Sequence, residues 1–427
     1  ASSHRTPVGF SRDTIISWDS LRFQPRFTAT AANIGYFWWS NDIGGHMLGG
    51  SDDTMAARWF QLGCFSPINR LHSSNSGFTS KEPWRYSRDA RATMEAHLRL
   101  RHRLVPYLYT WARRSAGEGI APVRPVYHDH PRELAAYEHR GSFFFGDLLV
   151  VPFTSPLDGT TGLGRELTWL PDGVWYDLPT GLRYEATTGG RGRMLSLSRP
   201  LDRIGVLARA GSVIPLAGNL TEAAGDNPRE LEIVVVPGGS GSFTLEEDDG
   251  SAQPGEDQIA RTHMALTWPD AEEEEEDGAD VVLRIRLEGA AEVVPASRLV
   301  TVRLLAGQVA GAWLGVGELA RRLATEEVSG DGFTLGAGTL VHLEELSRQE
   351  LIDGVQLVLR GTKHSPADWR DEVHAILDAA RVEYMAKDLA WDAVQRGLSG
   401  TALLGELEAL GLPETLRAAV AEVLPHS

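Results

Sequence analysis

Apolar and polar positions follow two different periods in the first part of the chain. Phe27 to Ala32 and Arg58 to Leu62 have helical spacing, whereas Tyr36 to Ser40 and Cys64 to Ile68 are apolar runs typical of strands. Strands that are separated by short helical segments favour an α/β region over a sandwich of two sheets. We therefore expect an α/β fold up to about residue 135.

Longer helices are predicted in two other places. Arg85 to Arg114 has apolar residues at helical spacing, and Pro106 should kink this helix or break it in two because proline has no N–H to donate. The last sixty residues are also helical. One apolar stripe runs from Trp369 to Tyr384 with Asp368 as its N-cap, and a second runs from Leu403 to Leu410.

Between these helical regions the pattern is that of β-structure. The run from Phe143 to Val151 and recurring turn signals such as Pro171-Asp172-Gly173 predict a small antiparallel sandwich that ends near residue 216. A second β region follows, with strands at 231–236, 283–287 and 300–304. Five consecutive acidic residues at 272–276 are expected to form a solvated loop.

Composition excludes several classes of protein. The chain has 427 residues and a formal net charge of −17, which argues against nucleic acid as a partner. No apolar run reaches the length of about 20 residues that a membrane span needs. The single cysteine, Cys64, allows no intrachain disulfide and makes a thiol-built zinc site improbable on composition.

The charge is unevenly distributed along the chain. Residues 1–135 have 17 basic and 11 acidic side chains, whereas residues 136–427 have 24 and 47. This change predicts different domains on either side of residue 136. The chain opens with Ala1-Ser2-Ser3 and has no initiator Met or signal segment, so we expect either that an upstream part was removed or that the sequence is a fragment.

Candidate catalytic groups gather in the first third. No phosphate-binding, dinucleotide-binding, zinc-protease or lipase-type motif is present. Instead, Asp13, Asp42, Arg70 and His72 each follow an apolar stretch by a few positions, as catalytic groups do where the strands of an α/β barrel end. Carboxylates, Arg, His and several Trp rings together suit a sugar. Each also has a structural interpretation: turn or cap for the aspartates, an ion pair for Arg70 and His72, and core packing for the tryptophans.

The order and spacing of several phrases identify a family. The stretch from Ser3 to Tyr109 resembles the second half of the catalytic domain of glycoside hydrolase family 31, the α-glucosidase and α-xylosidase family. The resemblance covers residues 3–250 well and extends loosely to about residue 345. Its phrases are His4-Arg5, Phe10-Ser11-Arg12-Asp13-Thr14, Trp18-Asp19-Ser20-Leu21-Arg22, Trp39-Ser40-Asn41-Asp42-Ile43-Gly44-Gly45-His46, Arg58 to Gly63, Phe65-Ser66-Pro67, Arg70-Leu71-His72, Glu82-Pro83-Trp84 and Arg103 to Tyr109.

The resemblance implies retaining hydrolysis of terminal α-linked glucosyl or xylosyl residues, with no cofactor and no metal. One carboxylate attacks the anomeric carbon, and a second, about 5–5.5 Å away, protonates the leaving oxygen and later activates water. By position, Asp13 matches the general acid/base of the family. The residues that match its sugar-binding positions are Asp42, Arg70, His72, Phe10, Trp39 and His46.

Two departures from the family pattern matter. The family nucleophile is an Asp in a Trp-x-Asp phrase upstream of the acid/base, and the chain begins only twelve residues before Asp13. We therefore expect about half a barrel, without the nucleophile and inactive alone. The second departure is Arg12, where the family usually has glycine. A guanidinium beside Asp13 would lower the pKa of the Asp13 carboxyl group, whereas a general acid needs a raised pKa. This conflict disappears if the Arg12 side chain points away from Asp13.

These inferences define an expected architecture. Residues 1–135 would form the C-terminal half of a (β/α)8 barrel, 136–216 and 217–362 two antiparallel β-sandwiches, and 363–427 a helical tail. Its partners would be an α-linked oligosaccharide and the missing N-terminal half of the barrel, but no nucleic acid and no membrane. The sequence does not decide whether the chain forms a homo-oligomer or in which compartment it acts. The alternatives are an inactive carbohydrate-binding or degenerate family member and, more weakly, an oligomerisation module.

Overall fold

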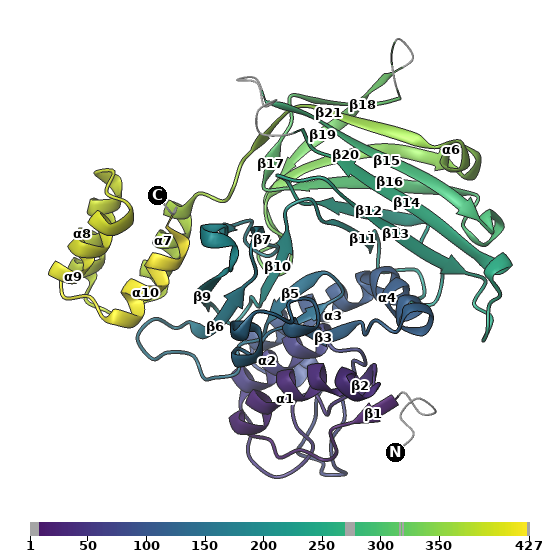
Figure 1. Cartoon of the computed structure of the whole chain (residues 1–427). Coiled ribbons are helices and arrows are strands. Elements are labelled where there is room, and N and C mark those ends of the chain that lie inside the picture. Colours follow the sequence, from purple (N-terminus) through teal and green to yellow (C-terminus); the bar gives the residue numbers. More distant parts are fainter. Residues whose placement is uncertain (1–7, 270–277, 316, 318–319, 425–427) are drawn as a thin grey trace.

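The first part of the chain combines two parallel strands with helices. The computed structural model describes residues 8–269, 278–315, 317 and 320–424, so the predictions for His4-Arg5 and for the loop at 272–276 lie outside the described residues. Helix α1 lies in sequence between the two paired strands, which makes a β-α-β unit at the lower end of Figure 1. The elements are β1 (Val8–Phe10), α1 (Trp18–Thr30), β2 (Trp38–Ser40), α2 (Asp53–Cys64), α3 (Arg88–Arg103), α4 (Val105–Glu118) and α5 (Leu134–Glu138).

Most of the predicted elements of this region are confirmed, with one exception. The helical segments at 27–32 and 58–62 lie within α1 with its short continuation and within α2. The long helix is broken in two at Leu104, and Pro106 occupies the first turn of α4. Proline is tolerated there because the N–H groups of the first turn have no hydrogen-bond partner within the helix. The strand expected at 64–68 is wrong: Cys64 ends α2, and only Ile68 forms a single parallel bridge, to Ser40.

A six-stranded sheet and a two-stranded sheet follow. The apolar run at 143–151 is split by a turn at Gly146-Asp147, and both faces of its strands are buried. Alternate residues enter two different cores, as the period of two in a strand requires. The six-stranded sheet has the order β3 (Val123–Pro125), β4 (Phe143–Phe145), β5 (Leu148–Val151), β10 (Gly205–Arg209), β7 (Val174–Asp177) and β8 (Arg183–Glu185), and the two-stranded sheet pairs β6 (Gly164–Leu170) with β9 (Arg193–Arg199).

The largest sheet has 11 strands and is mostly antiparallel; only β12 and β16 pair in parallel. Its two ends meet, because β11 contacts β13 and β14. In order, its strands are β11 (Val213–Ala217), β12 (Glu230–Val235), β16 (Ser297–Leu305), β20 (Gly338–Ser347), β19 (Arg321–Val328), β18 (Gly311–Leu314), β21 (Val355–His364), β15 (Ala279–Gly289), β14 (Ile259–Thr267) and β13 (Gly241–Asp248), with β17 (Gly307–Gln308) paired to β21 and α6 (Arg348–Asp353) between β20 and β21.

The sheets divide the chain at points other than those expected. Strand β3, before residue 136, belongs to the six-stranded sheet, and β11, before residue 217, belongs to the 11-stranded sheet. The hydrogen-bonded units therefore comprise residues 123–209 and 213–364. The division into domains at 136 and 217 stays a prediction.

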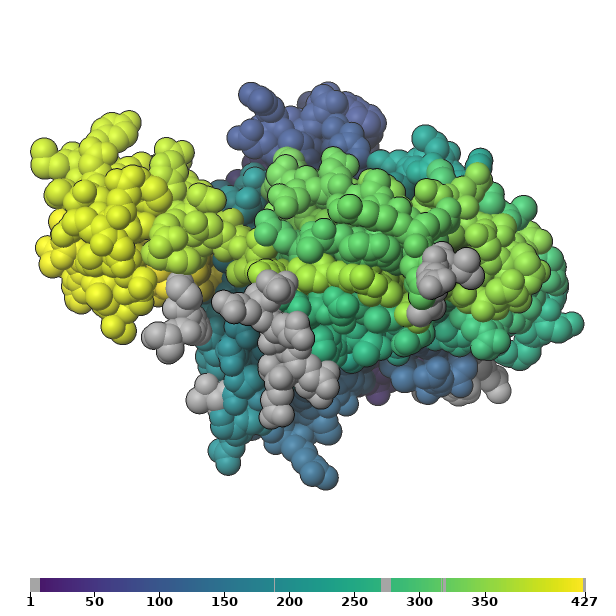
Figure 2. Space-filling model, turned by 90° about the horizontal axis from the view of Figure 1, so that it is seen from above, coloured from purple at the N-terminus to yellow at the C-terminus, as the bar shows by residue number. Residues whose placement is uncertain are grey.

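Four helices end the described chain: α7 (Trp369–Ala379), α8 (Tyr384–Gln395), α9 (Gly400–Ala409) and α10 (Glu414–Val423). The single stripe expected from Trp369 to Tyr384 is divided between two helices, because α7 ends at Ala380 and α8 begins beyond Glu383. Asp368 is the N-cap, and its side chain accepts a hydrogen bond from the Arg370 N–H. Figure 2 shows these helices beside the large sheet. Within the described parts of the chain, every helix is too short or too polar to cross a bilayer.

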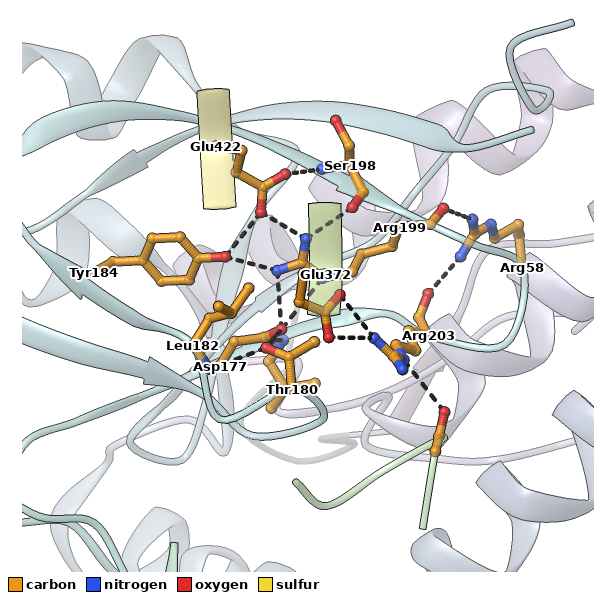
Figure 3. Close-up of polar contacts among 12 residues, drawn as sticks. Arg58, Asp177, Thr180, Leu182, Tyr184, Ser198, Arg199, Arg203, Glu372 and Glu422 are labelled. Atoms are coloured by element: carbon orange, nitrogen blue, oxygen red, sulfur yellow. Dashed lines mark hydrogen bonds and ion pairs between the residues drawn. The ribbon is translucent and has the colours of Figure 1, made fainter. Parts of the chain in front are cut away.

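A buried ionic cluster joins these helices to the sheets (Figure 3). The Arg199 guanidinium on β9 contacts Asp177 on β7 at 2.9 Å and Glu422 on α10 at 2.6 Å. Tyr184 donates to Glu422 at 2.8 Å, and the Ser198 N–H donates to the other oxygen of Glu422 at 2.5 Å. The cluster is closed by apolar side chains of the same helices and strands, which form one continuous core.

A second buried arginine connects the N-terminal region to the sheets. Arg58 of α2 donates to the carbonyl oxygens of Arg203 at 2.6 Å, Arg199 at 2.9 Å and Pro200 at 3.0 Å. Burial lowers its pKa to about 9. These bonds connect α2 to the end of β9 and to the turn that follows it, and so they hold the β-α-β region against the sheets.

Candidate active site

Parallel pairing aligns the segments that carry the candidate residues. Strands β1 and β2 pair in the register Phe10 to Ser40, and single parallel bridges continue from Ser40 to Ile68 and from Ile43 to Leu71. The three segments therefore run side by side and end at the same edge. The loops that follow them, which start at residues 11, 41 and 69, meet at this edge as the sequence predicts.

Four of the candidate side chains form a row of polar groups across this edge. Asp42 is fully buried, and its Oδ1 accepts a hydrogen bond from Arg70 Nη2 at 2.5 Å. The His46 ring lies between two carboxylates: its Nδ1 is 3.5 Å from Asp42 Oδ2, and its Nε2 is 3.7 Å from Asp13 Oδ2. The side chain of Asp13 is 51% exposed, so this carboxylate is open to a ligand.

Two further candidates border this group. The Arg70 guanidinium lies 5.0 Å from the centroid of the Phe10 ring, a cation–π distance. The rings of His46 and His72 are 4.9 Å apart. Phe10 is 41% exposed, so its ring offers an apolar face next to polar groups. The structure thus brings together Asp13, Asp42, Arg70, His72, Phe10 and His46.

Trp39 occupies a different position. Its side chain is buried, and its indole contacts the rings of Phe27 at 4.8 Å and Tyr36 at 5.9 Å in tilted or edge-on geometry. A Cβ on Gly9 would come within 2.6 Å of the indole, so Gly9 leaves the room that the ring occupies. The described contacts make Trp39 a packing residue under β1 and β2. Its sugar-binding role stays a prediction.

Lys81 is the residue near the site that the sequence did not indicate. Its Nζ donates to the carbonyl of Gly44 at 2.6 Å, and the side chain is buried. Burial lowers the pKa of Lys81 to about 8, and the nearby Asp42 carboxylate opposes this shift. Lys81 lines a cavity of about 520 Å³, which lies beside the row formed by Asp13, His46, Asp42 and Arg70. Gly44 has a φ of +85°, and a Cβ there would lie 2.8 Å from Lys81 Nζ.

Arg12 has an unusual backbone conformation. Its φ of 65° lies in the left-handed region, which costs a non-glycine residue about 1–2 kcal/mol. The side chain of Arg12 is exposed, and in the described structure it forms no ion pair with Asp13. The backbone therefore gives a physical reason for a glycine at this position.

Replacing Arg12 with glycine is expected to raise the free energy of unfolding by about 0.5–1 kcal/mol, because the relief of strain exceeds the added entropy of the unfolded chain. Urea denaturation followed by tryptophan fluorescence measures this change. Arg22→Gly is the matched control: Arg22 lies within α1, so the same substitution should lower the stability by about 1 kcal/mol. A loss of stability in Arg12→Gly would contradict the strain.

Two family models match the first half of the chain. The family model described as the glycosyl hydrolases family 31 TIM-barrel domain matches residues 1–111, and that of the glycosyl hydrolase family 31 C-terminal domain matches residues 119–214. The chain is 30% identical over 247 residues to an alpha-xylosidase of Saccharolobus solfataricus, an alignment that covers 57% of this chain and 32% of the relative. The chain thus spans about a third of the length of that protein.

Two solved structures have the same fold over a large part of the chain. The alpha-xylosidase of Xanthomonas citri superposes with a TM-score of 0.59 at 28% identity, over 69% of this chain and 32% of that one. A dextranase of Flavobacterium johnsoniae, in complex with glucose, superposes with a TM-score of 0.67 at 20% identity, over 83% of this chain and 44% of that one. Residues 1–111 and 119–214 are thus similar to two successive domains of glycoside hydrolase family 31.

Proposed function

We propose that this chain takes part in the hydrolysis of terminal α-linked glucosyl or xylosyl residues with retention of configuration, and that Asp13 is the general acid/base. The observation that carries this proposal is the row of side chains from Asp13 through His46 and Asp42 to Arg70 at one edge of parallel strands. An exposed carboxylate next to a buried one gives the two groups different tasks. Asp13 can reach a leaving oxygen, whereas Asp42 is already engaged by Arg70.

The remaining residues are suited to hold the sugar. The carboxylate of Asp42 accepts hydrogen bonds from hydroxyl groups, and Arg70 and His72 present N–H donors beside it. The half-exposed ring of Phe10 offers an apolar surface to a sugar face. Relatives include alpha-xylosidases and a dextranase with bound glucose, which supports an α-linked glucoside or xyloside as the substrate class.

Retention requires a second carboxylate about 5–5.5 Å from the first. Asp42 is fully buried, so we assign the nucleophile to a part of the enzyme other than the described residues. In this proposal the β-α-β region is the C-terminal half of an eight-stranded barrel, the sheets of residues 123–364 form two sandwiches, and α7 to α10 are a helical tail. Among the described residues, β1 pairs only with β2, which supports a sheet that continues in another segment.

The isolated 427-residue chain is therefore expected to show no turnover of p-nitrophenyl α-glucoside or α-xyloside, because protonation without a nucleophile does not cleave the glycosidic bond. Release of nitrophenol is measured, with a complete family enzyme assayed in parallel as the positive control. Measurable turnover of either nitrophenyl glycoside by the isolated chain would show that the nucleophile is present after all.

A further inference from the structure

Three groups that commonly bind metal ions converge at the candidate site. Asp42, His46 and His72 each present one ligand atom, and these three atoms all lie within 4.8 Å of one another. Asp42 follows β2, His46 lies four residues further along the same loop, and His72 follows the bridge at Leu71. Parallel pairing of the neighbouring segments thus holds two imidazoles and one carboxylate together.

Asp42 and His46 each have one buried side-chain atom without a hydrogen bond in the described structure. These atoms are Asp42 Oδ2 and His46 Nδ1, which face each other at 3.5 Å. A buried polar atom without a partner costs about 1–3 kcal/mol. The other oxygen of Asp42 is bound by Arg70, which fixes the carboxylate so that Oδ2 faces His46. When the His46 ring is neutral with its proton on Nε2, both atoms present lone pairs to the space between them.

The spacing fits a zinc ion. Zinc binds carboxylate oxygen and imidazole nitrogen at about 2.0–2.2 Å, so two ligand atoms of a tetrahedral site are about 3.3–3.6 Å apart. The separation of 3.5 Å between Asp42 Oδ2 and His46 Nδ1 already meets this value. His72 is half-buried, and its ring would have to move by about an ångström to bring all three atoms to this spacing. A hydrogen bond to the second carboxylate oxygen is also a usual support of zinc ligands.

We propose that Asp42, His46 and His72 bind one Zn²⁺ ion, with water at the open fourth position. The positive charges of Arg70 and Lys81 lie close to Asp42 and weaken the binding by repulsion, so we expect a lower affinity than that of a structural zinc site. Where the proposed sugar site is also correct, zinc and the sugar compete for the same three side chains, and the metal acts as an inhibitor.

Isothermal titration of the 427-residue chain, prepared without a histidine tag, with zinc chloride tests the proposal in the absence of sugar. We expect one ion per chain. His72→Gln should weaken binding at least about ten-fold, the loss typical of a perturbed zinc site. The matched control is His263→Gln: His263 also lies 3.6 Å from a carboxylate, Glu288, but lies on β14 and has no third ligand. This variant should bind zinc as the unmodified chain does.

Absence of binding with one ion per chain, or equal affinity in His72→Gln, would overturn the proposal. Circular dichroism shows whether the variants fold; because His72 is half-buried at the surface of the site, its replacement should leave the melting curve unchanged. His46→Gln is the second variant and should weaken binding similarly. Because no sugar is present, failure of the glycosidase proposal leaves this result unaffected, and zinc binding does not depend on turnover.

Discussion

Replacing Arg199 with methionine is expected to lower the free energy of unfolding by about 3–5 kcal/mol, the cost of leaving buried charges without a counter-ion. Arg199 is the cation that faces both Asp177 and Glu422, and all three side chains are almost completely buried. Methionine retains much of the volume, so the loss reports charge rather than packing. Denaturation by urea gives the stability, and limited proteolysis shows whether α10 separates from β9.

The stability loss should depend on pH. Burial raises the pKa of Glu422, and Arg199 opposes this shift, so the folded-state pKa rises further when the arginine is removed. A carboxyl group whose pKa is higher in the folded state than in the unfolded state binds a proton more tightly when the protein is folded. Its contribution to stability is therefore greatest at low pH and is lost as the pH rises above the unfolded pKa of about 4.3. The difference between Arg199→Met and the unmodified chain should therefore be smaller at pH 4.5 than at about pH 7.

Arg183→Met is the matched control for this experiment. Arg183 lies on β8, which pairs with β7, the strand of Asp177, and it forms an ion pair with Glu185 at 3.1 Å, but both side chains are about half exposed. An exposed pair contributes about 0–1 kcal/mol, so this variant should unfold nearly as the unmodified chain does. Equal losses in Arg183→Met and Arg199→Met would show that the buried cluster has no special role.

Replacing Asp13 with asparagine, in a protein that contains both halves of the barrel, is expected to lower kcat/KM for an α-linked disaccharide by about 10²–10⁴-fold. Asparagine keeps the shape of the side chain but cannot give a proton to the leaving oxygen. The half-exposed position of Asp13 means that the substitution should leave the fold unchanged. Initial rates over a range of substrate concentrations measure the effect.

The leaving group distinguishes an acid catalyst from a binding residue. A nitrophenolate leaves without protonation, so bond cleavage in Asp13→Asn should be far less impaired for a nitrophenyl glycoside than for a disaccharide. Asp19→Asn is the control, because Asp19 is 91% exposed on the following helix and should retain full activity. An equal loss with both substrates would assign Asp13 to sugar binding instead of proton transfer.

The sequence predicts the candidate site better than it predicts the long-range contacts. Asp13, Asp42 and His72 lie in short phrases after apolar segments, and parallel pairing of these segments places the side chains together. Lys81 has no such signal, since a single lysine in a polar loop does not reveal that its ammonium group reaches the carbonyl of Gly44. Trp39 shows the converse: an aromatic residue inside a site phrase can point into the core.

Local patterns also fail where tertiary structure decides. The apolar residues at 64–68 are typical of a strand, but α2 runs through Cys64, and the loop that follows is held by Arg101, which donates to the carbonyls of Cys64 and Pro67 at 2.9 Å. The contact of Arg199 with Glu422 spans 223 residues, and neither position has a pattern that predicts the other. Sheet membership of β3 and β11 likewise depends on pairing across loops.

The late position of α10 in the chain has a consequence for biosynthesis. The face of the six-stranded sheet that includes Leu149, Val151 and Leu207 shares its core with Leu416 and Val420 of α10. At roughly 5–20 residues per second, the 223 residues between Arg199 and Glu422 take about 11–45 s to synthesise. Throughout that interval α10 has not yet been synthesised. The apolar sheet face and the Arg199 side chain, both buried in the folded protein, therefore remain exposed on the ribosome. The nascent chain is thus expected to need a chaperone until α10 emerges.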